Sequence, residues 1–331
     1  MANMQAPAQI PLLYRDLVLR EDEASDGESD SRILKTDRRS GMPRMMYGTA
    51  WKMEQTADLV YKAIKAGFRA LDTAAQPKHY NEAGVGEGVR RAIREGIARR
   101  QDLWIQSKFT SASGQRGQAP YDPTSPLKTQ VETSILGSLV CFRVEEDREP
   151  YLDSLVLHAP YKDDASNAQV WSCFEEFVPD KIRYLGISNL LGDSGVLETL
   201  LQQSRVKPAI IQNRFHAPTK YEVELRERWC TDDQGAIIFQ SFWTLSANPD
   251  MLASTAVEEV AQGARVTKTA AFYCLVMGLG KICVLNGTTR ERHMREDLEG
   301  WELVSTWADG EGKAAWERSL RAFKSIIGQA D

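Results

Sequence analysis

The sequence has few of the residues that build metal sites and disulfides. Five cysteines and four histidines occur among 331 residues, and no two cysteines form a CxxC pair. Because metal-binding motifs need such ligands at close and regular spacing, we expect no metal site. Since most of the cysteines lie inside apolar segments, we expect them to be reduced core residues. They are Cys141, Cys173, Cys230, Cys274 and Cys283.

An excess of positive charge and a long apolar run are also missing. The net charge is −5 and acidic and basic residues are interspersed, which argues against a nucleic acid partner. Apolar stretches are interrupted well before the ~18 residues that a membrane helix needs, and the first residues lack the layout of a signal peptide. With 42% apolar and 26% charged residues, we expect a globular protein of the cytoplasm that does not bind a membrane.

Eight short apolar runs alternate with amphipathic segments between Met45 and Leu298. This pattern is typical of βα units, and eight parallel strands close into a (β/α)8 TIM barrel. A doubly wound open sheet is the alternative, but no GxGxxG turn follows the first run, so we favour the barrel. Among the helices, Thr56–Ala66 should end at Gly67. The apolar runs are Met45–Gly48, Arg69–Thr73, Leu103–Lys108, Tyr151–His158, Arg183–Ser188, Ala209–Gln212, Ala236–Gln240 and Ile282–Asn286.

We divide the chain into an N-terminal extension over residues 1–43, a barrel over residues 44–300 and a tail over residues 301–331. The tail should form a helix over Lys313–Ile327 that packs on the barrel. No internal repeat divides the chain further.

Three segments should lie apart from the strands and helices of the barrel. The apolar patch Ile10–Leu19 in the extension is a candidate hairpin or plug at the bottom of the barrel. The acidic run Glu21–Asp30 should loop into solvent. The segment Thr110–Pro126, rich in glycine, serine and proline, should be a mobile loop over the top face.

Ionisable residues close three of the apolar runs, namely Asp72, Lys108 and His158, and Tyr80 follows shortly after the first. Active sites of TIM barrels lie at the carboxyl ends of the strands, where these residues should meet. A buried Asp–Lys pair or a single histidine can be structural, but several together indicate proton-transfer chemistry. An ammonium beside a phenol would lower the phenol's pKa, so Lys108 could activate Tyr80 as an acid.

Six segments of the chain closely resemble the signatures of the aldo-keto reductases, in the family's order and over about residues 44–298. The resemblance implies a TIM barrel that reduces aldehydes and ketones with NAD(P)H, and a catalytic tetrad of Asp72, Tyr80, Lys108 and His158. The spelling of Gln76–Glu82 and Gln240–Leu245 is most like that of fungal members. The six segments are Gly67–Ala74, Asn81–Glu87, Leu103–Lys108, Leu155–His158, Gly186–Asn189 and Ile211–Gln212.

The spacing of Tyr80 departs from the family pattern. The resemblance places the tyrosine five residues after the aspartate and two before the Asn-Glu pair, whereas Tyr80 is eight residues after Asp72 and directly precedes Asn81. His79 occupies the position counted from the Asn-Glu pair. A longer loop would absorb the offset, and no other phenol is nearby, so we assign the acid to Tyr80. The alternative is a tyrosine that only packs on the start of the next helix.

The resemblance also implies a set of cofactor contacts. Ser188, Asn189 and Gln212 would bind the nicotinamide carboxamide, and Phe242, rather than Phe239 or Trp243, would stack on the ring. The segment Asn286–Arg292 resembles the site of the adenosine phosphate, where Asn286 replaces the usual lysine, Thr288 follows it and Arg292 aligns with the phosphate-binding arginine. Helix N-terminal amides with an arginine suit a phosphate, which favours NADPH over NADH. Glu296 aligns with the residue that contacts adenine.

Substrate contacts should come from Trp51, Phe109, the Thr110–Pro126 loop and the tail. Arg214 replaces an acid that the family commonly carries two residues after the glutamine. We therefore expect an NADPH-dependent aldo-keto reductase, a monomer or weak dimer, that acts on a small carbonyl compound with Tyr80 as general acid. The alternatives are an NADPH-binding regulatory subunit and a non-redox elimination or isomerisation on the same barrel.

Overall fold

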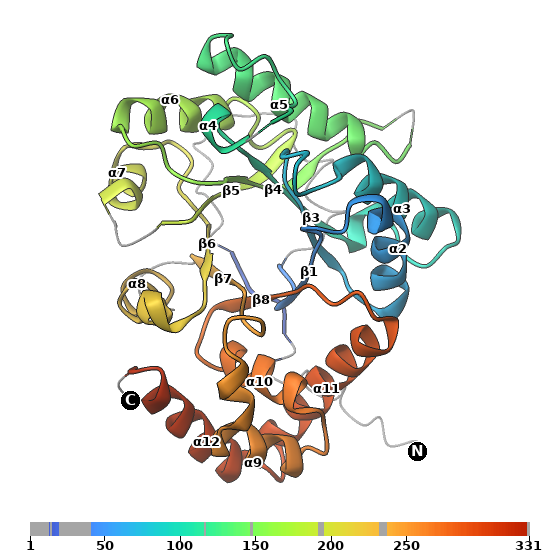
Figure 1. Cartoon of the computed structure of the whole chain (residues 1–331), viewed down its shortest axis with the longest axis vertical. Helices are drawn as coiled ribbons and strands as arrows, with labels where there is room; N and C mark the ends of the chain where they lie inside the picture. The colour runs from blue at the N-terminus through green and yellow to red at the C-terminus, as the bar shows by residue number, and fades with distance from the viewer. Residues whose placement is uncertain are drawn as a thin grey trace, which may run out of the picture.

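Eight parallel strands form a closed barrel in which each strand pairs with the next and β8 pairs with β1 (Figure 1). The computed structural model describes residue 13 and residues 15–19, 41–115, 117–145, 148–190, 195–231 and 237–329. This arrangement confirms the predicted (β/α)8 TIM barrel. The strands are β1 (Met45–Gly48), β2 (Ala70–Asp72), β3 (Trp104–Phe109), β4 (Leu152–Leu157), β5 (Ile182–Ser188), β6 (Ile210–Arg214), β7 (Ile238–Phe242) and β8 (Ile282–Asn286).

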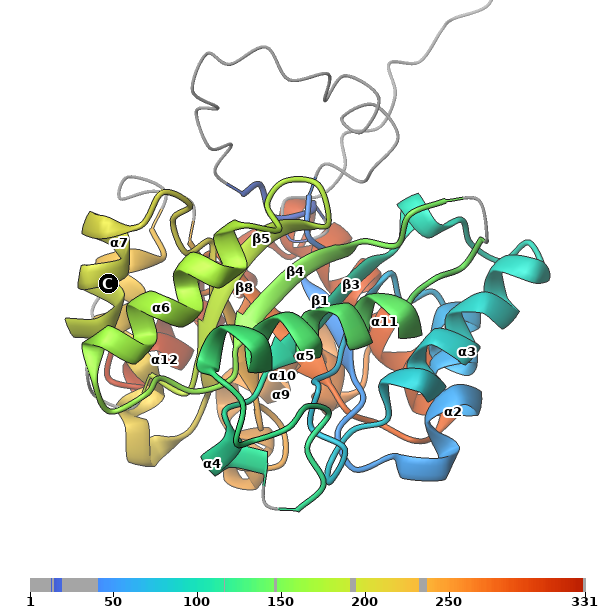
Figure 2. The ribbon, with the colours of Figure 1, turned by 90° about the horizontal axis from the view of Figure 1, so that it is seen from above.

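Helices surround the barrel on its outside (Figure 1), and in the side view of Figure 2 they lie in front of the strands and on either side of them. Helix α2 has the predicted bounds, and Gly67, at a φ of 123°, ends it in a conformation that favours glycine. The helices are α2 (Thr56–Ala66), α3 (Glu82–Arg94), α4 (Ala112–Gln115), α5 (Leu127–Cys141), α6 (Asp164–Glu175), α7 (Gly195–Gln203), α8 (Val223–Trp229), α9 (Thr255–Gly263), α10 (Lys268–Met277), α11 (Glu291–Asp309) and α12 (Lys313–Ile326). Short 3₁₀ segments are η2 (Met53–Gln55), η3 (Arg100–Asp102), η4 (Ala217–Glu222) and η5 (Pro249–Ala253).

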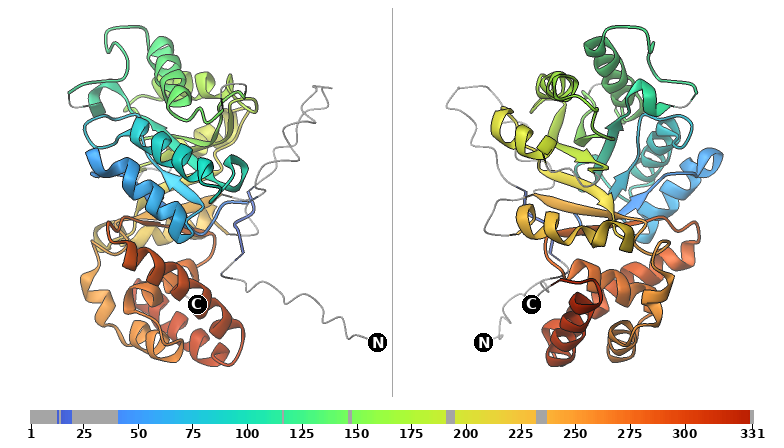
Figure 3. Two further views of the ribbon diagram at one scale, coloured as in Figure 1. Left: turned by 90° about the vertical axis from the view of Figure 1, so that its right-hand side faces the viewer. Right: turned by 60° about the vertical axis from the view of Figure 1, so that its left-hand side comes forward.

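The predicted tail helix is present as α12, which packs beside α9 and α10 (Figure 3). Phe323 of α12 meets Phe272 of α10 with ring centroids 5.8 Å apart, and Ser319 donates to Glu259 of α9. Residue 300, the proposed end of the barrel, lies inside the continuous helix α11.

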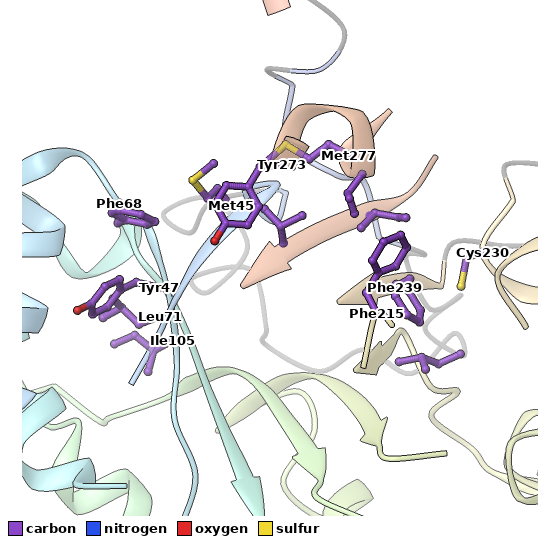
Figure 4. Close-up of a cluster of buried hydrophobic side chains, with 14 of the residues drawn as sticks. Met45, Tyr47, Phe68, Leu71, Ile105, Phe215, Cys230, Phe239, Tyr273 and Met277 are labelled. Atoms are coloured by element: carbon purple, nitrogen blue, oxygen red, sulfur yellow. The ribbon is translucent and has the colours of Figure 1, made fainter. Parts of the chain in front are cut away.

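Apolar side chains fill the space between the strands and the helices. Tyr47, Phe68, Leu71 and Ile105 lie together in one such layer, and the rings of Tyr47 and Phe68 are 5.4 Å apart (Figure 4). Because successive strand residues point to opposite faces, the same strands can send polar side chains into the barrel.

The amino ends of the strands are covered by a short antiparallel bridge between Leu17 and Met42. Leu17, Leu19 and Met42 are buried against strand residues such as Trp104 and Ile238. This burial fits the predicted plug. Residues 10–12, residue 14 and the acidic run Glu21–Asp30 lie outside the described residues.

The segment expected as a mobile loop, Thr110–Pro126, carries the short helix α4 and two buried anchors. The Tyr121 hydroxyl donates to the Thr110 carbonyl at 2.5 Å, and the Gln115 amide donates to the Ala75 carbonyl at 2.9 Å. These bonds tie the segment to the ends of β2 and β3.

The five cysteines are free, and four are buried while Cys141 is half-buried. Among the described helices, none is both long enough and apolar enough to cross a bilayer. The described residues contain no group of three or more His, Cys, Asp or Glu side chains that could bind a metal ion.

Candidate active site

The carboxyl ends of the strands open into a cavity of about 790 Å3. It extends from the start of α3 across the barrel to the start of α11. Of the residues selected from the sequence, Lys108, Phe109 and Arg292 do not line it. Those that do are Trp51, Asp72, Tyr80, His158, Ser188, Asn189, Gln212, Phe242, Asn286, Thr288 and Glu296.

Asp72 and Lys108 form a buried ion pair at the floor of the cavity, which Asp72 lines and Lys108 does not. The Lys108 ammonium donates to both Asp72 carboxylate oxygens at 2.6 and 2.7 Å and to the Thr73 carbonyl at 2.8 Å. These contacts use all the N–H donors that a lysine has. Burial lowers the pKa of Lys108, and the Asp72 carboxylate opposes that shift.

A layer of glutamine amides supports this ion pair from inside the barrel. Gln106 and Gln212 each donate to Asp72 Oδ1, at 2.8 and 3.0 Å. Gln106 and Gln240 form a reciprocal amide pair at 2.7 and 2.8 Å, and Gln240 also accepts from Gln212. Ser154 donates to Gln106 at 2.8 Å. Because the amide nitrogen of each of these three glutamines has partners inside the barrel, the layer holds the Asp72 carboxylate in place.

His158 follows β4 and faces the cavity as a neutral imidazole. Burial, aided by the charges of Lys108 and His79, lowers the pKa of His158 to about 3. Its Nδ1 lies 2.7 Å from the Thr110 hydroxyl. The other ring nitrogen has no protein partner among the described residues, which leaves it for a ligand.

Tyr80 lies beside His158, with ring centroids 6.0 Å apart and the rings edge to face. The Lys108 ammonium lies 5.2 Å from the Tyr80 ring centroid. The expected lowering of the Tyr80 pKa by Lys108 is not found. The N–H groups of Lys108 donate to Asp72 and Thr73. Burial, with a smaller effect from the Asp72 charge, instead raises the pKa of Tyr80, so the phenol keeps its proton.

A tight turn explains how Tyr80 reaches this place despite its unusual spacing. The amides of His79 and Tyr80 both donate to the Gln76 carbonyl at 3.0 Å, so the extra residues form a compact turn. Asn81 then caps α3 by accepting from the Gly84 amide at 2.9 Å. His79 turns to the cavity mouth, where its ring lies 4.0 Å from that of Trp51.

Ser188, Asn189 and Gln212 line the next part of the cavity, but their donors are already used within the protein. Ser188 donates to the Gln212 carbonyl, and the Asn189 amide donates to the His158 carbonyl, both at 2.7 Å. The Gln212 amide donates to Asp72 and Gln240. The Gln212 side-chain oxygen is therefore the group of this trio that is left to accept from a ligand.

Phe242 ends β7 beside two other large side chains. The Arg214 guanidinium lies 5.1 Å from the Phe242 ring centroid and 4.7 Å from that of Trp243. Phe242, Trp243 and Arg214 all line the cavity, so the Arg214 side chain faces the site.

The turn after β8 carries the remaining predicted residues. Asn286 donates to Asp297 at 2.7 Å and accepts from the Thr288 amide at 3.0 Å, so it shapes the turn. Arg292 stands on the first turn of α11 with a side chain that is 81% exposed, and it pairs with Glu296 at 2.6 Å. An arginine this exposed can leave its partner for a phosphate.

Of the two predicted substrate contacts, Trp51 lines the cavity and Phe109 does not. Trp51 stands at the mouth of the cavity, 69% exposed, with a positive φ of 65° that is unusual for a bulky residue. Phe109 is wrong as a substrate contact, because it is fully buried against Tyr121 and Phe174 outside the barrel. Lys108 points into the barrel, so its neighbour on the strand points out.

Comparisons with known proteins agree with this geometry. The model of the Aldo/keto reductase family matches residues 43–233. The chain belongs to this family. Together with the D-xylose reductase relatives, this membership indicates an oxidoreductase that acts on carbonyl groups.

Two fungal proteins and one solved bacterial structure are similar to the chain. An NAD(P)H-dependent D-xylose reductase of Pyricularia oryzae is 28% identical over 300 residues, which are 82% of this chain and 89% of that protein. An NAD(P)H-dependent D-xylose reductase of Pachysolen tannophilus is 30% identical over 191 residues, which are 50% of this chain and 54% of that protein. An aldo/keto reductase structure from Brucella melitensis has a TM-score of 0.62 at 18% identity and covers 80% of this chain and 95% of its own, which shows a shared fold.

Several residues of the site in this aldo/keto reductase were not predicted from the sequence. Lys52 directly follows Trp51, lines the cavity and donates to the Gly287 carbonyl at 2.9 Å. Because Lys52 closely follows the first strand, its position in the sequence could have indicated that it lies at the site. Burial lowers its pKa to about 8. Gln106 and Gln240 gave no such signal, because single polar residues inside strands do not reveal which side chains meet.

Proposed function

We propose that the protein reduces an aldehyde or ketone with NADPH and that Tyr80 protonates the carbonyl oxygen. The observation that carries the proposal is the pair of neutral, half-buried groups, Tyr80 and His158, side by side above the Asp72–Lys108 ion pair. A neutral phenol can donate a proton, and a neutral imidazole can donate a hydrogen bond to the same oxygen. The relatives named NAD(P)H-dependent support a nicotinamide cofactor.

The cavity residues fit such a cofactor. Gln212 offers an unused oxygen for the carboxamide, Phe242 a ring face for the nicotinamide, and Lys52 a cation that has no carboxylate partner among the described residues. The start of α11 would take the adenosine phosphate, with Thr288 beside it and Arg292 as its cation. Glu296 would contact the adenine. Arg292 is also the reason to prefer NADPH to NADH.

NADPH, when bound, would supply the hydride for the carbonyl carbon. Tyr80 gives its hydroxyl proton to the oxygen, so that the carbonyl becomes an alcohol. Thr110 can donate to Nδ1 of His158, which leaves the proton on Nε2 to hold the carbonyl oxygen toward Tyr80. Lys108 stabilises the phenolate that forms, and Asp72 holds Lys108 in place.

Single-turnover mixing tests this proposal. The enzyme with bound NADPH is mixed with 4-nitrobenzaldehyde, and absorbance at the nicotinamide band is followed. We expect the absorbance to fall with the formation of one alcohol per NADPH. A constant absorbance, also with D-xylose, would support a regulatory or non-redox role instead.

A further inference from the structure

Arg214 brings a positive charge into the cavity beside the reacting groups. Its Nη1 donates to the Asn189 side-chain oxygen at 2.7 Å, and Asn189 in turn donates to the His158 carbonyl. A chain of two hydrogen bonds through Asn189 therefore connects Arg214 to the backbone of His158. The centroids of the Phe242 and Trp243 rings lie 5.1 and 4.7 Å from the Arg214 guanidinium carbon.

No carboxylate neutralises this guanidinium among the described residues. The acids that line the cavity have other partners: Asp72 binds Lys108, Glu296 binds Arg292 and Asp297 binds Asn286. Partial burial already lowers the pKa of Arg214, which shows that the charge has lost part of its water. An arginine cannot shed its proton in a protein, so a desolvated guanidinium is stabilised by an anion.

We propose that Arg214 binds a carboxylate of the substrate, so that the preferred carbonyl compounds carry a carboxylate group and an apolar body. The inference rests on the proposed carbonyl reduction. With Nη1 held by Asn189, the remaining N–H groups form an edge that matches the two oxygens of a planar carboxylate. Phe242, Trp243 and Trp51 supply the apolar walls for the body of the substrate.

The cofactor's phosphates are the other source of an anion in this cavity. The cations available for them are Lys52 and Arg292, on the β1 and β8 side. Arg214 lies on β6 and is tied to His158 through Asn189, on the side where the carbonyl would bind. The position therefore favours the substrate.

The test compares 4-carboxybenzaldehyde with its neutral analogue methyl 4-formylbenzoate, using NADPH and the whole chain. The readout is the ratio of the two kcat/KM values. In Arg214→Gln we expect this ratio to fall by roughly tenfold or more, because hydrogen bonds to charged groups are strong. Arg214→Lys keeps the charge but not the planar edge and should retain part of the ratio. Arg228→Gln removes a surface arginine bound to Glu198 and is the matched control, with the wild-type ratio.

Two further measurements separate the possible failures. Calorimetric titration with 4-carboxybenzaldehyde reports the Arg214 site even if no aldehyde is reduced: binding that Arg214→Gln abolishes supports the site while the proposed reduction fails. The dissociation constant of NADPH, measured for wild type and Arg214→Gln, shows whether Arg214 binds a phosphate of the cofactor instead. An unchanged substrate ratio in Arg214→Gln overturns the proposal, and a weakened NADPH affinity beside it would assign Arg214 to a cofactor phosphate.

Discussion

Tyr80 and His158 are neutral for the same reason, which is that burial opposes charge on either ring. Burial raises the pKa of Tyr80 and lowers that of His158. The contribution of Lys108 therefore differs from the one that the sequence indicates. It does not hold a preformed phenolate, since its donors are taken, but its charge lies where a phenolate would form after proton transfer.

Tyr80→Phe removes the proposed proton donor while keeping the ring. The rate of carbonyl reduction should fall by about 10²–10⁴-fold, which is the usual contribution of a general acid to the rate. The affinity for NADPH should stay close to that of the wild type. Stopped-flow rates and NADPH fluorescence titration measure the two quantities. If Tyr80→Phe stays active and His79→Ala does not, the donor is His79.

Arg292→Ala tests the proposed contact with the 2′-phosphate. The dissociation constant for NADPH should rise by about tenfold or more while that for NADH changes little, because only NADPH carries the phosphate. Arg295→Ala on the same helix removes an exposed arginine paired with Glu291 and is the control. Equal weakening of both cofactors by Arg292→Ala would mean that no 2′-phosphate binds there.

At the scale of the elements, strands and their ends could be predicted from the sequence far better than the contacts between strands. Short apolar runs that end on a polar residue locate β2, β3 and β4, and with them Asp72, Lys108 and His158. The error over Phe109 arose within one strand, where adjacent residues face opposite sides. The amide layer depends on the register between β3, β6 and β7, for example Gln212 opposite Gln240, and no local pattern encodes that register.

The amide layer should behave as one unit when its members are replaced. Gln240→Leu leaves donors of Gln106 and Gln212 unpaired, so it should cost about 1–3 kcal/mol of unfolding free energy. Adding Gln106→Leu should cost less than the sum of the single changes, by about 1 kcal/mol or more. Urea unfolding measures all four proteins. Gln106→Leu with the exposed Gln262→Ala on α9 should be additive, and additivity in the Gln106–Gln240 pair would contradict a shared layer.

Across the whole molecule, the barrel interior changes character from one end to the other. Leu17, Leu19 and Met42 fill the amino end, the glutamine layer follows, and the ion pair and the cavity occupy the carboxyl end. Gln240 connects the first two layers, with its amide 3.3 Å from the Met42 sulfur. The site thus stands on a filled barrel, which limits the movement of Asp72 and Lys108.

The half-buried, neutral His158 should make the stability of the whole chain depend on pH. The pKa of His158 falls from 6.5 to about 3 on folding, so between these values the unfolded chain binds a proton that the folded chain does not. Stability should therefore fall as pH falls through this window, by up to ~1.4 kcal/mol per pH unit from this group. The difference in unfolding free energy between wild type and His158→Asn isolates the effect. A difference that does not change between about pH 8 and about pH 5 would contradict it.

The central claim is that a carbonyl carbon receives hydride in the cavity while Tyr80 protonates its oxygen. NADPH carrying deuterium at both C4 positions, mixed with the enzyme and 4-nitrobenzaldehyde, tests this claim most directly through the mass of the alcohol. We predict one deuterium on the alcohol carbon for each NADPH consumed, and no labelled alcohol above background with Tyr80→Phe on the same timescale. An alcohol without deuterium, or NADPH that is not consumed, would contradict the account.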